Sequence, residues 1–277
     1  MNTLPFPALG AAALVAFAMS AVPSAAAVGE WVAGDHARVR LVAAGVDTAG
    51  NLSGGIEIEI DPDWHTYWRS PGDAGVPPVL DFAGSVNIDE PVVAYPAPAR
   101  LDDGFSVSNV YTDYVLLPLT ARADSASRPI DLVLKLDIGV CAEVCVPEHF
   151  EARLSVPATE TDLAANKLIA AGRATVPGAP VAGVFSVESA ARAGGIDNRP
   201  VFEIKARVPD AKSTTVFVEG PPDWYPAPAE LAEESGGLAV YRVEFDRLTA
   251  KTPIPGAPLT VTLVSGGRAI EQTLTLD

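Results

Sequence analysis

Residues 131–156 read DLVLKLDIGVCAEVCVPEHFEARLSV. On either side of CAEVCVPE, apolar and polar side chains alternate, which is typical of a strand with one face on a core. Two cysteines four residues apart in one extended strand would lie ~13 Å from each other, too far for a disulfide. We therefore expect Cys141 and Cys145 on a bend between two antiparallel strands. We further expect that this bend exposes both sulfurs to a partner and that Pro147 ends the ladder.

Short alternating segments of this kind recur along the chain. RVRLV at residues 38–42 and IEIEI at residues 56–60 are examples, and most such runs end in Gly, Pro or Asp. The long helical periodicity that a parallel sheet needs for its crossover connections is missing. The sequence therefore predicts an all-β chain built from antiparallel β-sandwiches.

The N-terminus has the features of an export signal. Residues 11–19 are apolar, and Ala25, Ala26 and Ala27 supply the small residues of a signal-peptidase site. We expect residues 1–27 to be a cleavable signal peptide and the mature chain not to insert into a membrane. The formal net charge of −16 argues against nucleic acid and anionic lipid as partners.

One helix and one linker divide the rest of the chain. Thr161 or Asp162 can cap a helix over residues 161–172, with Leu163, Leu168 and Ile169 as its apolar stripe and Gly172 as its end. Pro177-Gly178-Ala179-Pro180 follows as a linker. The predicted domains are a redox β-sandwich at residues 28–157, a helix and linker at 158–180, and a second β-sandwich at 181–277. The second has strands near residues 201–208, 214–219, 240–245 and 259–264.

Two motifs occur in both predicted sandwiches. YPAPARL at residues 95–101 resembles YPAPAEL at residues 225–231, and Pro-Asp-Trp follows a strand at residues 62–64 and at 222–224. A duplicated sandwich unit and a coincidence of composition both remain open.

The two cysteines are the only ones in the chain, and charged residues flank them. A five-residue ring stabilises a fold by only ~2 kcal/mol, so a redox role is favoured over a structural one. The negative charges of Glu143 and Glu148 should disfavour the thiolate, and His149 could oppose them when protonated. These three residues are the candidates for tuning the cysteine pKa values.

An aromatic segment, DPDWHTYWRSPGDAGVPP at residues 61–78, is the second unusual feature. Trp64, Tyr67 and Trp68 could shield the cysteines or receive a partner's loop, or they could plug the end of the sandwich core. His65 has no accompanying nucleophile or metal-ligand spacing and is not expected to be a catalytic base.

Three motifs resemble a known family. WHTYWRSPGDAGVPP at residues 64–78, YPAP at 95–98 and VCAEVCVPE at 140–148 are similar to the N-terminal periplasmic domain of DsbD and ScsB-type thiol:disulfide interchange reductases. The resemblance covers residues 30–157 and is nearer to the ScsB-type branch.

The resemblance implies an immunoglobulin-like sandwich without a cofactor. Its cysteine pair, here Cys141 and Cys145, would pass electrons between a membrane-embedded donor and periplasmic thioredoxin-fold proteins. Cys145 would form the mixed disulfide, and Tyr67 and Trp68 would cover the pair. Two further aromatic residues, Trp64 and Tyr111, are candidates for shielding or partner binding. Because the sequence has no multi-helix membrane domain, the donor is expected to be a separate membrane protein, and the family's enzyme activity as a protein-disulfide reductase is left open.

Two alternatives remain. Cys141, Cys145 and His149 are soft ligands suited to Cu(I), so a periplasmic copper-binding protein is possible. A structural sandwich module would have a buried, inert pair. The sequence argues against a hydrolase, because it has only three histidines, no G-x-S-x-G motif and no discernible catalytic arrangement among its 35 acidic residues.

Overall fold

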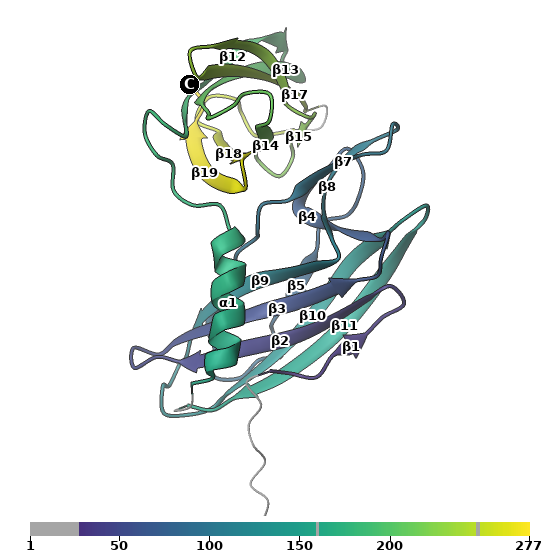
Figure 1. The fold of residues 1–277 in the computed structure, drawn as a ribbon, viewed down its shortest axis with the longest axis vertical. Helices are drawn as coiled ribbons and strands as arrows, with labels where there is room; N and C mark the ends of the chain where they lie inside the picture. The colour runs from purple at the N-terminus through teal and green to yellow at the C-terminus, as the bar shows by residue number, and fades with distance from the viewer. Residues whose placement is uncertain (1–27, 159–160, 248–249) are drawn as a thin grey trace, which may run out of the picture.

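The computed structural model describes residues 28–158, 161–247 and 250–277. The predicted signal peptide, residues 1–27, lies outside them. Within the described residues the chain is all-β with one helix, and its named strands pair antiparallel, so the predicted fold class is confirmed. Figure 1 shows two stacks of strands, which we call the first sandwich (β1–β11) and the second sandwich (β12–β19), with α1 between them along the chain.

The first sandwich has two sheets. One has the strand order β1-β2-β3-β9-β6, and the other has the order β11-β10-β4-β8-β7 with β5 paired to β10. The strands are β1 (Val32–Ala33), β2 (Ala37–Val46), β3 (Asn51–Ile60), β4 (His65–Gly72), β5 (Val79–Asp81), β6 (Asp89–Val93), β7 (Ala99–Asp102), β8 (Val107–Thr112), β9 (Tyr114–Arg122), β10 (Ile130–Cys141) and β11 (Cys145–Val156).

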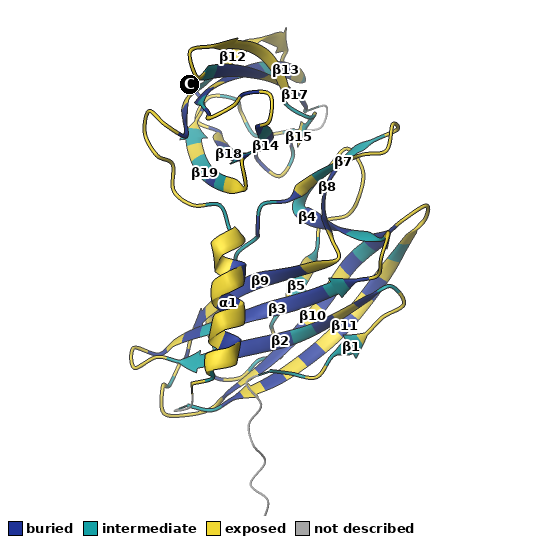
Figure 2. Ribbon diagram, viewed as in Figure 1, coloured by how far each residue is buried: buried dark blue, intermediate teal, exposed yellow. Residues whose placement is uncertain are grey.

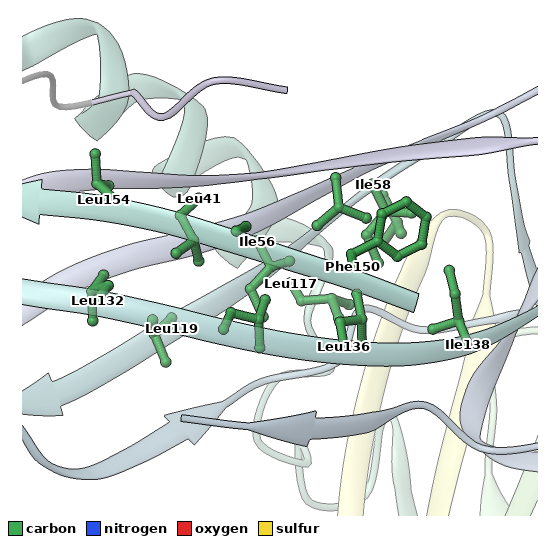
Figure 3. Close-up of a cluster of buried hydrophobic side chains, with 14 of the residues drawn as sticks. Leu41, Ile56, Ile58, Leu117, Leu119, Leu132, Leu136, Ile138, Phe150 and Leu154 are labelled. Atoms are coloured by element: carbon green, nitrogen blue, oxygen red, sulfur yellow. The ribbon is translucent and has the colours of Figure 1, made fainter. Parts of the chain in front are cut away.

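Period-two patterning builds the core between these sheets. In β10 the buried residues Leu134, Leu136 and Ile138 alternate with exposed ones, and β11 alternates in the same way (Figure 2). Figure 3 shows Leu41 and Ile56 of the facing sheet packed against Leu132, Phe150 and their neighbours. Burial of one face of each sheet therefore fixes the register of the strands.

Helix α1 (Leu163–Thr175) begins where the sequence predicts but uses a different face. Asp162 is the N-cap and accepts from the backbone N–H of Ala165. Leu163 is 80% exposed, and the buried face consists of Ala165, Ile169 and Gly172. Of the predicted stripe, Ile169 is buried but Leu163 and Leu168 are exposed, and the predicted stop at Gly172 is wrong.

Close packing against the sheet explains why a glycine lies inside the helix. A Cβ at Gly172 would lie 2.5 Å from a side-chain carbon of Leu116, so glycine lets α1 approach the outer face of the sheet. The helix packs on β2, β3 and β9, as Figure 1 shows, and buries Val42 and Ala44 there.

The second sandwich has its own core. One sheet has the order β12-β13-β17-β15 with β16 paired to β17, and the other has the order β14-β18-β19. The strands are β12 (Ser186–Ile196), β13 (Arg199–Arg207), β14 (Thr215–Glu219), β15 (Tyr225–Pro226), β16 (Glu230–Ser235), β17 (Leu238–Asp246), β18 (Pro258–Ser265) and β19 (Arg268–Thr275). The four strands predicted here from sequence coincide with β13, β14, β17 and β18.

The repeated Pro-Asp-Trp motif forms a hydrogen-bonded turn in both sandwiches, but the backbone conformation of the two turns differs. The backbone N–H of Trp64 donates to the carbonyl of Asp61, and that of Trp224 donates to the carbonyl of Pro221. One turn follows β3, which ends at Ile60, and the other follows β14, which ends at Glu219. Asp63 has a positive φ of 68°, whereas Asp223 does not, so the two turns are of different type although the tryptophan N–H closes both.

Candidate redox site

The cysteines lie at the tip of the β10–β11 hairpin and form a disulfide with a Cα–Cα distance of 4.1 Å. Cys141 is the last residue of β10, Cys145 is the first of β11, and the two are paired directly in the register. The predicted bend between antiparallel strands is present.

The connection is shorter than the sequence suggested. Only residues 142–144 separate the strands, because the ladder includes Pro147, which pairs with Gly139. The prediction that Pro147 ends the ladder is therefore wrong. Strand β11 is at the edge of its sheet, and a proline without an N–H is tolerated at an edge.

The two sulfurs differ in exposure. Cys145 is exposed, whereas Cys141 is only 2% exposed and belongs to a small buried cluster with Tyr67 and Val110. The expectation that both sulfurs are open to a partner is wrong for Cys141. A thiolate approaching from solvent can therefore reach the Cys145 side of the disulfide more easily.

Tyr67 of β4 covers the buried sulfur. Its hydroxyl donates to Cys141 Sγ at 3.1 Å and lies 3.6 Å from Cys145 Sγ. Glycines flank its ring: a Cβ at Gly139 would lie 3.5 Å from it, and one at Gly75 would lie 2.3 Å from it. Because Gly75 also has a φ of +108°, no other residue suits that position. Burial, together with the charge of Asp103, raises the pKa of Tyr67, so its hydroxyl keeps its proton at neutral pH.

His65, which was not expected to be a catalytic base, lies beside the disulfide. It pairs with Cys141 across β4 and β10, and its ring meets that of Tyr67 edge-on at 5.3 Å. Burial lowers the pKa of His65, and the charge of Asp103 opposes this effect only in part. The sequence signal was the alternation in WHTYW, which puts residues 65 and 67 on one face.

The other predicted aromatic residues lie elsewhere. Trp68 is 0% exposed in the core between the sheets, and Tyr111 is in the same core and donates to the carbonyl of Pro96. Trp64 stacks on His36 with ring centroids 3.5 Å apart. The expectation that Trp68 covers the cysteines is corrected, because adjacent strand residues point to opposite faces and Tyr67 occupies the cysteine face.

The three charged residues that flank the cysteines in the sequence lie in different environments. Glu143 is exposed in the hairpin turn beside the cysteines. Glu148 is buried on the opposite face of β11, where its Oε1 accepts from the backbone N–H of His36 at 2.8 Å. His149 is exposed, and its Nδ1 lies 2.6 Å from Asp137 Oδ1.

The position of His149 bears on the copper alternative, in which Cys141, Cys145 and His149 would be the ligands. His149 lies four residues after Cys145 in the same extended strand, a span of ~13 Å. In the part of the chain that the structure describes, no three His, Cys, Asp or Glu residues are grouped so as to hold a metal ion. The structure does not bring together the ligand set of the copper alternative.

The fold and the site together define an antiparallel β-sandwich with a half-buried disulfide on an edge hairpin. Residues 30–157 match the family described as "Thiol:disulfide interchange protein DsbD, N-terminal". The resemblance inferred from sequence is thus confirmed, and these residues form a thiol:disulfide interchange domain of the DsbD N-terminal type.

A solved structure matches over a longer part of the chain. The crystal structure of the N-terminal periplasmic domain of ScsB from Proteus mirabilis has a TM-score of 0.72 at 21% sequence identity, and the match covers 90% of this chain and 98% of that one. The shared fold therefore extends into the second sandwich. A comparison with curated proteins gave no match. Among residues 28–158, 161–247 and 250–277, no helix is long and apolar enough to cross a membrane.

Proposed function

We propose that this protein is a periplasmic thiol:disulfide interchange protein. Its Cys141–Cys145 pair passes reducing equivalents to or from thioredoxin-fold partners, and a separate membrane protein is the electron donor. Residues 28–157 act as the redox domain and residues 181–277 as a second domain. The match to a DsbD N-terminal family and the likeness to a periplasmic domain support this proposal.

The observation that carries the proposal is the unequal exposure of the two sulfurs. A partner thiolate attacks the exposed Cys145 Sγ, a new intermolecular S–S bond forms, and the Cys141–Cys145 bond breaks with Cys141 leaving as a thiolate. A second partner thiolate then attacks the partner's own sulfur in the mixed disulfide and releases Cys145. Two electrons have then moved from the partner to the pair, and the reverse sequence reduces a partner.

Tyr67 assists the step in which Cys141 leaves. Its hydroxyl already donates to Cys141 Sγ at 3.1 Å, so a charge-assisted hydrogen bond stabilises the developing thiolate. The neighbouring His65 supplies no positive charge there at neutral pH, because burial lowers its pKa below the ordinary value. The phenol is thus the group that we assign to the leaving sulfur.

Single-cysteine variants test the assignment. Cys141→Ser and Cys145→Ser are each mixed, in the presence of a Cu(I) chelator, with a thioredoxin whose one remaining active-site cysteine carries an activated aromatic disulfide. We expect Cys141→Ser to form a mixed disulfide through exposed Cys145, and the matched Cys145→Ser variant to react much more slowly. Equal reaction of both variants would overturn the assignment of the sulfurs, and no adduct with either would overturn the proposed function.

A further inference from the structure

The pairing of β4 with β8 is interrupted directly after Tyr67. The register runs from Tyr67↔Val110 to Gly72↔Ser108, so residues 68–71 stand opposite the single residue 109. This bulge follows the residue that contacts the disulfide. Something other than the regular ladder must therefore hold it in place.

The second sandwich contacts two residues of the bulge, Trp68 and Arg69. Trp68 meets Phe217 of β14 edge-on at 5.6 Å, and Phe217 is part of the first sandwich's core cluster. Arg69 donates from Nε to Glu219 Oε1 at 2.9 Å and from Nη2 to Glu219 Oε2 at 2.7 Å. The same Nη2 also donates to Glu271 of β19.

Two aromatic rings of the first sandwich also lie close to Arg69. Its guanidinium lies 4.7 Å from the ring centroid of Trp68 and 5.8 Å from that of Tyr95. A second arginine, Arg100, donates to the carbonyl of Val216 at 2.7 Å beside this contact. In Figure 1, the second sandwich accordingly lies over the end of the first where β4 and β8 are found.

Charge makes Arg69 the critical member of this contact. Two half-buried carboxylates, Glu219 and Glu271, share one guanidinium. Burial alone would lower the pKa of Arg69, but the hydrogen bonds and charges of both glutamates outweigh it and raise the pKa. Without Arg69 the two carboxylates would repel each other beside the bulge, and the bulge would lose its hydrogen bonds to the second sandwich.

We infer that Arg69 is a positioning residue for the disulfide: by fixing the bulge to Glu219 and Glu271, the second sandwich holds the Tyr67 hydroxyl on Cys141. The inference rests on the proposed function and gives the second sandwich a part in it. Arg69 contacts neither sulfur and acts only through Tyr67, two residues away on the same strand.

A double-mutant cycle tests the coupling. The rate of reduction of the disulfide by dithiothreitol is measured in the full chain for Arg69→Gln, Tyr67→Phe and the double variant. We expect Arg69→Gln alone to slow reduction by about threefold or more, because the hydrogen bond from Tyr67 to Cys141 is partly lost. In a protein that already carries Tyr67→Phe, the same substitution should have little further effect on the rate. Equal slowing in both backgrounds would overturn the inference.

Two further variants exclude a general loss of stability. Arg242→Gln removes an arginine of the second sandwich whose Nε and Nη2 both donate to Glu203 Oε1. It is far from β4 in sequence, and its loss should leave the rate unchanged. If Arg69→Gln does not fold, Glu271→Gln enters the same cycle, because it keeps the pair between Arg69 and Glu219. Its effect must likewise depend on Tyr67, or the inference is wrong.

The proposed function fails separately from this inference. If Cys145 forms no mixed disulfide with a thioredoxin-fold partner but the cycle still shows coupling, the positioning of Tyr67 stands and the proposed exchange does not. If exchange occurs and the cycle is additive, only the role of Arg69 is lost.

Discussion

The hydroxyl of Tyr67 donates a hydrogen bond to Cys141 Sγ, 74 residues further along the chain, at 3.1 Å. It therefore joins strand β4 to the buried half of a disulfide whose other half, Cys145, faces solvent. The contact therefore distinguishes the two sulfurs, of which Cys145 is attacked and Cys141 leaves in the exchange that we propose.

Removing this hydroxyl should slow disulfide exchange without unfolding the protein. Tyr67→Phe keeps the ring between Gly75 and Gly139 but loses the hydrogen bond to the leaving thiolate. A hydrogen bond to a charged group contributes ~1.5 kcal/mol, so we expect reduction by dithiothreitol to slow by about tenfold. Stopped-flow measurement of the rate checks this. Tyr241→Phe, which removes a hydroxyl bound to the carbonyl of Ala211 in the second sandwich, is the control and should leave the rate unchanged.

The disulfide should contribute little to stability. A Cys141→Ser/Cys145→Ser variant loses a ring of five residues, which the chain-entropy relation values at ~2 kcal/mol, and the register of twelve pairs between β10 and β11 holds the hairpin without it. We expect the variant to stay folded, with a thermal midpoint lowered by about 2–8 °C. Calorimetry provides the measurement. A variant that is unfolded at 25 °C would show that the pair is structural.

Sequence reasoning found the hairpin because its signals are local. Alternation over residues 131–140 and the four-residue spacing of the cysteines were enough to require a bend there. The partner of the disulfide was harder to find, because Tyr67 reaches Cys141 only through the register of β4 against β10. That register is set by the pairs Val140↔Thr66 and Cys141↔His65, which join segments more than 70 residues apart.

One error could have been avoided from the sequence. Tyr67 and Trp68 are neighbours in a strand, so both cannot face the cysteines, and the same rule separates Glu148 from Cys145. The buried face of α1 could not be predicted from the sequence by such a rule. A glycine at position 172 predicts a helix end, and only its close approach to Leu116 in the folded chain explains why a glycine lies inside the helix instead.

Trp68 should behave as a core residue. It is fully buried between the sheets and touches Phe217, so Trp68→Ala should lower the free energy of unfolding by ~3–5 kcal/mol. Denaturant unfolding measures this loss. Trp31→Ala is a matched control: Trp31 is only partly buried and lies under the guanidinium groups of Arg38 and Arg40, so its loss should cost clearly less. Equal costs for the two tryptophans would contradict the placement of Trp68.

The pKa of His65 predicts how stability depends on pH. Burial lowers the pKa of His65 below its ordinary value of 6.5, so between that pH and the folded-state pKa the unfolded chain binds more protons than the folded one. The contribution of His65 to stability is therefore complete above pH 6.5 and is lost as the pH falls toward the folded-state pKa. We expect His65→Gln to flatten the decrease in the free energy of unfolding between pH 7.5 and 5.5.

Asp103→Asn provides the matched variant for this prediction. The charge of Asp103 raises the pKa of His65 against the effect of burial, while its carboxylate accepts from the backbone N–H groups of Phe105 and Ser106, which an asparagine oxygen can still do. Without that charge the pKa of His65 should fall further, and the loss of stability should extend to lower pH. Titration of the His65 ring by NMR in the two proteins measures the pKa directly. A pKa at or above 6.5 in the native chain, or one that rises in Asp103→Asn, would contradict the burial of this histidine beside Cys141.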